Sequence, residues 1–196
     1  MEICFATNNS NKIKEVQNLV GEKYQLLSLA DIGCFEELPE EQATLEGNAA
    51  QKAMYVYEKY GLNCFADDTG LEVDALNGDP GVFSARYAGP QRSNEDNILL
   101  LLKNLSKVQD RSASFRTIIH AVIDGGQSAF EGKVSGEILA EYKGDEGFGY
   151  DPIFKPAGFE LSFAQMTLEE KNKISHRAKA VNSFSNFLNT NFLKGQ

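Results

Sequence analysis

The chain has 196 residues, of which 42% are hydrophobic and 24% charged, a balance typical of a soluble globular protein with one sizeable core. No apolar run approaches the roughly 18 residues of a membrane-spanning helix, and the N-terminal segment lacks the features of a signal peptide. The formal charge of −9 argues against a general nucleic-acid binder, which normally carries a basic patch. We therefore expect a single domain, residues 1–196, with no membrane or nucleic-acid partner.

The three cysteines, Cys4, Cys34 and Cys64, are an odd number and show no CxxC spacing. This pattern fits reduced thiols, and not a disulfide framework or a zinc site, so we expect a cytoplasmic protein. An acidic chain that binds a polyanion must gather its few cations at one place or use a metal. Lysines and arginines at turns are therefore of interest.

The N-terminal segment predicts a strand, a polar turn and a helix. Residues 3–6 are apolar, and apolar residues recur at helical spacing from 13 to 20. Between them lies the turn Thr7-Asn8-Asn9-Ser10-Asn11-Lys12. The free N–H groups of a helix N-terminus, together with Lys12, could hold a phosphate. An ordinary Asn or Ser N-cap explains the same residues, so the pattern leaves both interpretations open.

Residues 24–29 predict a second strand, and residues 30–43 an acidic loop that is either merely solvated or supplies a carboxylate to a metal. A long helix with an apolar stripe follows over residues 45–60. Asn48 and Lys52 lie one turn apart on another face of that helix.

A strand over residues 63–66 is expected to end at Asp67, Asp68, Thr69 and Gly70. Ligands of α/β proteins bind at the ends of strands. Two adjacent carboxylates there can hold a hard cation, and one can act as a general base. The alternative is an Asx turn in which Gly70 provides a permissive backbone.

In the second half, Ser93 predicts the N-cap of a helix. Its expected core-facing residues are Ile98, Leu99, Leu101, Leu102 and Leu105. Strands are expected at 115–123 and 127–133, joined by a hairpin turn at 124–126, with a further strand at 136–140. Residues 147–152, Gly-Phe-Gly-Tyr-Asp-Pro, place aromatic rings between glycines. The rings can stack on a planar base or tuck into the core.

Thr167 begins a capping box, and Ser175 can cap a last helix. Lys171, His176 and Arg177 lie around the junction of the two helices. Cations at a helix N-terminus oppose the macrodipole, which favours an anion or an acceptor-rich ligand nearby.

Taken together, five motifs occur in the order and spacing of one family: residues 7–12, 66–71, 80–87, 148–152 and 175–177. Over essentially its whole length the chain resembles the inosine triphosphate pyrophosphatase family, the non-canonical purine NTP pyrophosphatases. The resemblance implies a two-lobed α/β fold around a long mixed sheet with flanking helices, an active-site cleft between the lobes, and a homodimer. It also implies Mg²⁺-dependent cleavage of dITP, ITP or XTP between the α- and β-phosphates, which gives the monophosphate and pyrophosphate.

The resemblance also assigns roles. Asp68 corresponds to the general base and a metal ligand, and Glu40 to the second metal carboxylate. The implied nucleotide contacts are Thr7, Asn8, Asn9, Ser10, Asn11, Lys12, Lys52, Thr69, Phe148, Gly149, Tyr150, Asp151, Lys171, His176 and Arg177. Asp68 would then activate a water while the lysines hold the triphosphate. Phe148 would stack on the base, and donors from His176 and Arg177 would suit a 6-keto oxygen. Two alternatives are a nucleotide phosphatase with an aspartyl nucleophile and a nucleotide-binding sensor.

Overall fold

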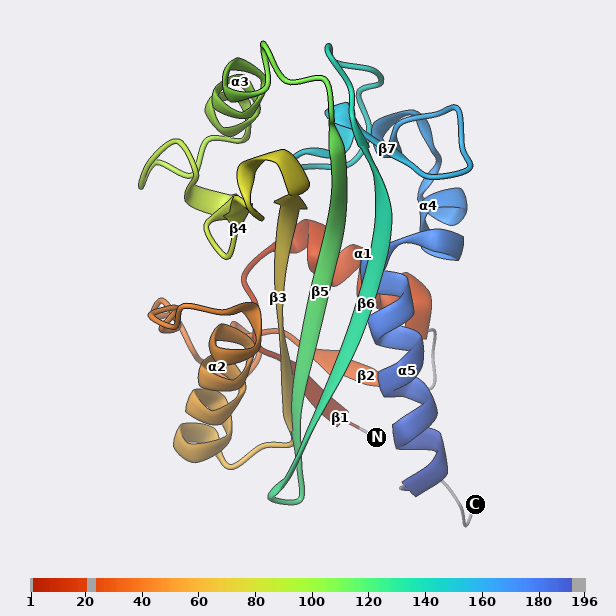
Figure 1. Cartoon of the computed structure of the whole chain (residues 1–196). Coiled ribbons are helices and arrows are strands. Elements are labelled where there is room, and N and C mark those ends of the chain that lie inside the picture. The colour runs from red at the N-terminus through yellow and green to blue at the C-terminus, as the bar shows by residue number, and fades with distance from the viewer. Residues whose placement is uncertain (1, 21–23, 192–196) are drawn as a thin grey trace. The chain divides into compact units, whose positions relative to one another are not determined.

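The computed structural model describes residues 2–20 and 24–191 (Figure 1). Its strands are β1 (Glu2–Phe5), β2 (Gln25–Leu27), β3 (Cys64–Val73), β4 (Pro80–Gly81), β5 (Ser112–Ile123), β6 (Gly126–Ile138) and β7 (Phe154–Pro156). They form one sheet in the order β2-β1-β3-β5-β6-β7, and β4 pairs with β3. β1 is parallel to β2 and β3, whereas β3–β4 and β6–β7 are antiparallel. The predicted mixed sheet is therefore confirmed.

The longer helices are α1 (Ser10–Val20), α2 (Leu45–Tyr60), α3 (Asn94–Asn104), α4 (Leu168–Ile174) and α5 (His176–Asn191). The chain forms two compact units. The first comprises Met1–Asp68, Thr117–Gly132 and Arg177–Gln196, and the second comprises Thr69–Arg116 and Lys133–His176. Strands β3, β5 and β6 contribute residues to both. A single domain over residues 1–196 and a cleft between lobes remain predictions.

The first unit has apolar side chains on both faces of its part of the sheet, because successive residues of a strand point to opposite sides. Phe5 and Phe65 stack at 4.5 Å between ring centroids on the face covered by α1 and α5, where Phe184 joins them. Cys4 and Ala66, their neighbours in the sequence, face α2 on the other side. Both faces of this part of the sheet are thus covered by helices (Figure 1).

The second unit has its own core around three phenylalanine rings, Phe115, Phe154 and Phe163. Helix α3 begins at the predicted cap, where the Ser93 side chain accepts a hydrogen bond from the Asp96 N–H. Its residues Ile98, Leu101 and the following Leu105 are buried. Leu99 is 53% exposed, so its prediction as a core residue was wrong, because it lies on the opposite side of the helix.

Two predicted strand boundaries were also wrong. β3 does not end at Asp67 but continues as extended backbone to Val73, which rules out an Asx turn there. β3 can continue beyond the end of β1 at Phe5 because β5 pairs with its other edge in the sheet. The strand expected at 136–140 is the end of β6, which runs without a break from the confirmed hairpin to Ile138.

Candidate active site

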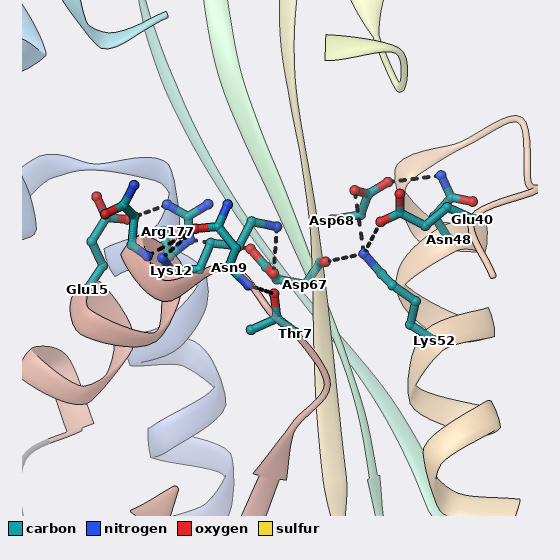
Figure 2. Close-up of polar contacts among 11 residues, drawn as sticks. Thr7, Asn9, Lys12, Glu15, Glu40, Asn48, Lys52, Asp67, Asp68 and Arg177 are labelled. Carbon is teal, nitrogen blue, oxygen red and sulfur yellow. Dashed lines mark hydrogen bonds and ion pairs between the residues drawn. The ribbon is translucent and has the colours of Figure 1, made fainter. Parts of the chain in front are cut away.

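Asp67 and Asp68 are the centre of the candidate site. They are consecutive on β3, so their side chains leave the strand on opposite faces. Figure 2 shows Asp67 directed toward the residues of α1 and α5, and Asp68 directed toward α2. The two carboxylates therefore do not hold one cation between them, which corrects the simplest interpretation of the sequence pair.

Asp67 is buried and faces two cations. Lys12 Nζ lies 2.8 Å from its Oδ1, and Arg177 Nε lies 3.3 Å from its Oδ2. Arg177 also pairs with the buried Glu15 through Nη1. Burial alone would raise the pKa of Asp67, but Lys12, Arg177 and Lys52 hold that pKa well below its usual range. Asp67 is thus an ionised internal acid that fixes Lys12 and Arg177.

The polar turn before α1 is organised by Asn9. Its Oδ1 accepts from the N–H groups of Asn11 and Lys12 at 3.0 and 3.2 Å, while Thr7 Oγ1 accepts from the Asn9 N–H. These are the bonds of a helix N-cap. The cap and a phosphate cradle compete for the same two N–H groups. The side chains of Asn8, Ser10 and Asn11 remain exposed at this turn.

Asp68 lies among residues of α2 and of the acidic loop. Asn48 Nδ2 donates to its Oδ2 at 3.1 Å, and Lys52 Nζ lies 3.8 Å from its Oδ1. Lys52 also contacts Glu40 Oε1 and the Asp67 carbonyl oxygen, each at 2.8 Å. Burial raises the pKa of Asp68 above its ordinary value, and Lys52 opposes this shift. At 13% exposure the Asp68 side chain stays accessible, unlike that of Asp67.

The acidic loop runs antiparallel along α2 and is fastened to it at four positions. Glu36 accepts from Lys59, Tyr55 and Tyr60 near the end of the helix. Glu40 meets Lys52, the Glu41 N–H donates to Gln51, and the Gln42 N–H donates to Asn48. This pairing directs Glu40, and not Glu41, toward Lys52 and Asp68 (Figure 2).

The oxygen atoms of Glu40 and Asp68 are the donor type that Mg²⁺ prefers. In the part of the chain that the structure describes, no three His, Cys, Asp or Glu side chains gather as a metal cage. Mg²⁺ commonly uses only one or two carboxylates and completes its octahedron with water and substrate phosphates. The carboxylates of Glu40 and Asp68 therefore fit the donor set of a magnesium ion that arrives with a triphosphate.

A second group of predicted residues lies in the second unit. The Lys171 ammonium is buried, lies 2.7 Å from Asp151 Oδ2 and sits over the rings of Phe148 and Phe163 at 5.2 and 5.5 Å. The same Asp151 oxygen accepts the Phe148 N–H at 2.8 Å. Gly147 has φ +78°, and a side chain there would collide with the Asp151 carboxylate. Glycine, aspartate and lysine thus fix the backbone that carries Phe148.

The other predicted residues also take defined positions. His176 is buried and stacks on Phe115 at 4.6 Å between ring centroids. Tyr150 is buried and donates to the Ser84 carbonyl oxygen, so its role is in the core. Thr69 and Gly149 are half-buried. The last of the predicted residues, Arg177, is paired with Glu15 and Asp67, and its contact with a base remains a prediction.

The family resemblance gave no role to three residues of the site: Glu15, Asn48 and Asp67. All are at most 5% exposed, and each contacts a predicted residue. The sequence feature that could have identified Glu15 is its charge beside the apolar stripe of α1. The feature that could have identified Asn48 is its position one turn before Lys52.

Comparisons with known proteins show the family of this chain. The Ham1 family matches residues 3–187, and the chain belongs to that family. A protein from Flavobacterium johnsoniae named dITP/XTP pyrophosphatase is 54% identical over 188 residues, covering 96% of this chain and 98% of that protein. A protein of the same name from Porphyromonas gingivalis is 50% identical over 95% of this chain and 97% of its own length.

Solved structures give the same result for the fold. The Ham1 protein of Staphylococcus aureus superposes with a TM-score of 0.88 and 39% identity, covering 97% of this chain and 99% of that protein. A HAM1 protein from Coxiella burnetii superposes with a TM-score of 0.89 and is 35% identical in sequence. The predicted α/β fold class is therefore confirmed. In the described residues no helix is long and apolar enough to cross a membrane.

Proposed function

We propose that this protein is a pyrophosphohydrolase for dITP, ITP and XTP. It would cleave each between the α- and β-phosphates, release the monophosphate and pyrophosphate, and remove these nucleotides from the pool. The observation that carries the proposal is the position of Asp68, an accessible carboxylate held between Asn48 and Lys52 with Glu40 beside it. The relatives named dITP/XTP pyrophosphatase support the choice of substrate.

In this proposal the first unit binds the triphosphate and performs the chemistry. Lys12 and Lys52 are held in place by Asp67 and neutralise phosphate oxygens, and the exposed side chains of the turn at 7–12 add hydrogen bonds. Asp68 orients a water and takes its proton as general base.

Glu40 and Asp68 would hold Mg²⁺, which would neutralise charge on the phosphates when it is bound. Lys52 would then exchange its contact with Glu40 for one with a phosphate oxygen. Because its ammonium already lies between the carboxylates, this exchange needs only a rotation of a flexible side chain.

The second unit would bind the base. Phe148 presents an aromatic ring whose backbone is fixed by Asp151, and a base can stack on such a ring. His176, Arg177 and backbone N–H groups would donate to the 6-keto oxygen of hypoxanthine or xanthine. The 6-amino group of adenine would place a donor against these donors, which disfavours it.

We also propose that the enzyme is a cytoplasmic homodimer. The resemblance to the family supports the dimer, and the free, buried thiols of Cys4, Cys34 and Cys64 fit a reducing compartment. Size-exclusion chromatography with light scattering would test the dimer, since a monomer mass at micromolar concentration would contradict it.

The function is tested by turnover of dITP, XTP, dGTP and dATP with Mg²⁺, with pyrophosphate and orthophosphate detected separately. The proposal predicts pyrophosphate from dITP and XTP and little from dGTP or dATP. Omission of Mg²⁺ should abolish release. Orthophosphate as first product would indicate a phosphatase, and tight binding without turnover would indicate a sensor.

A further inference from the structure

Asn48 is a buried polar residue to which the proposed function gives neither a catalytic nor a substrate-binding role. It lies in the first turn of α2, its backbone N–H donates to the Thr44 carbonyl oxygen, and its side chain is 1% exposed. A buried amide in this position costs stability unless both of its ends are hydrogen-bonded. Both ends are bonded here, and each partner belongs to the candidate site.

The orientation of the Asn48 amide is fixed by its partners. Its Oδ1 accepts from the Gln42 backbone N–H at 2.9 Å, and its Nδ2 donates to Asp68 Oδ2 at 3.1 Å. A backbone N–H can only donate and an ionised carboxylate can only accept. In the reverse orientation the Asn48 amide N–H groups would face the Gln42 N–H, and the amide oxygen would face the Asp68 carboxylate. Only the observed orientation therefore satisfies both neighbours.

The two oxygens of Asp68 are therefore held by different residues of one helix. Asn48 binds Oδ2, and Lys52, one turn later, lies near Oδ1 (Figure 2). Rotation of an aspartate carboxylate about χ2 is soft, with broad minima. Lys52 can leave Asp68 for a phosphate, but Asn48 has a short side chain that is anchored at its other end. Asn48 is thus the constraint that stays when the substrate binds.

The approach of the loop to α2 is also built into the chain. A Cβ at Gly47 would lie 2.6 Å from Gln42 Cβ, so the absence of a side chain there lets Gln42 reach the helix. The Gln42 N–H is two residues from Glu40. One amide thus connects the loop that carries Glu40 to the carboxylate of Asp68.

We propose that Asn48 is a positioning residue for hydrolysis: it fixes the orientation of the Asp68 carboxylate and its register with Glu40. This inference rests on the proposed function. Asn48 acts through Asp68 and touches neither substrate nor metal. Its loss should therefore lower kcat while leaving the affinity for nucleotide nearly unchanged.

Two substitutions separate the two bonds. Asn48→Asp has the same shape and can still accept the Gln42 N–H, but it presents an oxygen to Asp68. Asn48→Leu has a similar size, carries no charge and removes both bonds. The matched control is Gln51→Leu, because the Gln51 side chain holds the same loop through hydrogen bonds with Glu41 and not through Asp68.

We expect kcat for dITP to fall about 100-fold in both Asn48 variants, as for other small misplacements of a catalytic group. Affinity for a dITP analogue with a methylene between the α- and β-phosphates, measured by calorimetry, should stay within about threefold of wild type. Gln51→Leu should keep the wild-type kcat and the wild-type affinity for the analogue. If Asn48→Leu does not fold, Asn48→Asp, which retains the loop bond, decides the question.

Two results would overturn the inference. The first is a kcat within about threefold of wild type in the Asn48 variants, a loss too small for a misplaced catalytic group. The second is a joint loss of affinity and kcat that Gln51→Leu shares, which would assign Asn48 to loop anchoring alone. Wild-type enzyme is assayed first. Absence of pyrophosphate release there would refute the proposed function itself, and the inference with it.

Discussion

Asp67 and Asp68 are adjacent on β3, yet their carboxylates enter different environments: Asp67 is 1% exposed beside Lys12 and Arg177, whereas Asp68 is accessible beside Asn48 and Lys52. A strand turns each successive side chain to the other face, so a two-residue motif can serve two purposes. Asp67 organises the cations of the site, and Asp68 is left to perform the chemistry.

This division predicts different effects of the two Asp→Asn substitutions on stability. Asp67→Asn should lower the free energy of unfolding by about 3–5 kcal/mol, because it removes the carboxylate that half-buried Lys12 and buried Arg177 face. Asp68→Asn should be nearly neutral, because burial already disfavours the Asp68 charge, as its raised pKa shows. Urea unfolding of both variants at pH 7 measures the difference. Equal losses in the two variants would refute the division of roles.

The contact of Lys171 with Asp151 predicts that these two residues of the second unit are strongly coupled in their contributions to stability. Asp151→Asn can still accept the Phe148 N–H but loses the charge opposite the buried Lys171 ammonium. We expect Asp151→Asn and Lys171→Met each to cost about 3–5 kcal/mol, and the double variant to cost much less than the sum.

Thermal or urea unfolding of the wild type, both single variants and the double variant gives the coupling energy. Additive losses would show that the pair is not coupled. The exposed pair of Glu169 and Lys173 on α4 provides the control, since a similar cycle there should give less than about 1 kcal/mol.

The hydrogen bonds of Glu36 predict that its carboxylate makes a pH-dependent contribution to the stability of the fold. Hydrogen bonds from Lys59, Tyr60 and Tyr55 stabilise its carboxylate, and its pKa is lowered to about 2. The folded pKa lies below the unfolded value, about 4.3 for a glutamate, so the contribution is present above the unfolded pKa and is lost as pH falls toward 2.

Glu36→Gln should therefore be less stable than wild type at pH 7, and the difference should shrink between about pH 5 and 3. Urea midpoints at pH 7, 5 and 3.5 test this. A difference that stays constant with pH would show that the Glu36 charge is not what fastens the loop to α2.

The sequence predicted the helices well, because their signals are local. Ser93 and Thr167 act as caps, and the apolar stripe of α5 from Ala178 to Leu188 is buried, as its spacing indicated. The length of β3 was not predictable in this way. Aspartate, threonine and glycine are poor strand formers, and only pairing with distant strands keeps residues 67–70 extended.

The same limit applies to the site. The motif residues identified Asp68, Lys12 and Lys52, but no local pattern shows that Glu15 meets Arg177 across 162 positions of sequence. The positive charge of Arg177 at the start of α5 is unfavourable without an anion nearby, as its position in the sequence indicates. The structure supplies two anions, Glu15 and Asp67, from within the protein.

The most direct test of the account is the substitution Asp68→Asn, with dITP turnover and dITP-analogue binding measured on the same preparation. Asparagine keeps the shape of the side chain but cannot accept the proton of the attacking water. We predict that pyrophosphate release falls by at least about 100-fold while affinity for the analogue changes little. Equal losses of turnover and binding would contradict the role of Asp68 as general base.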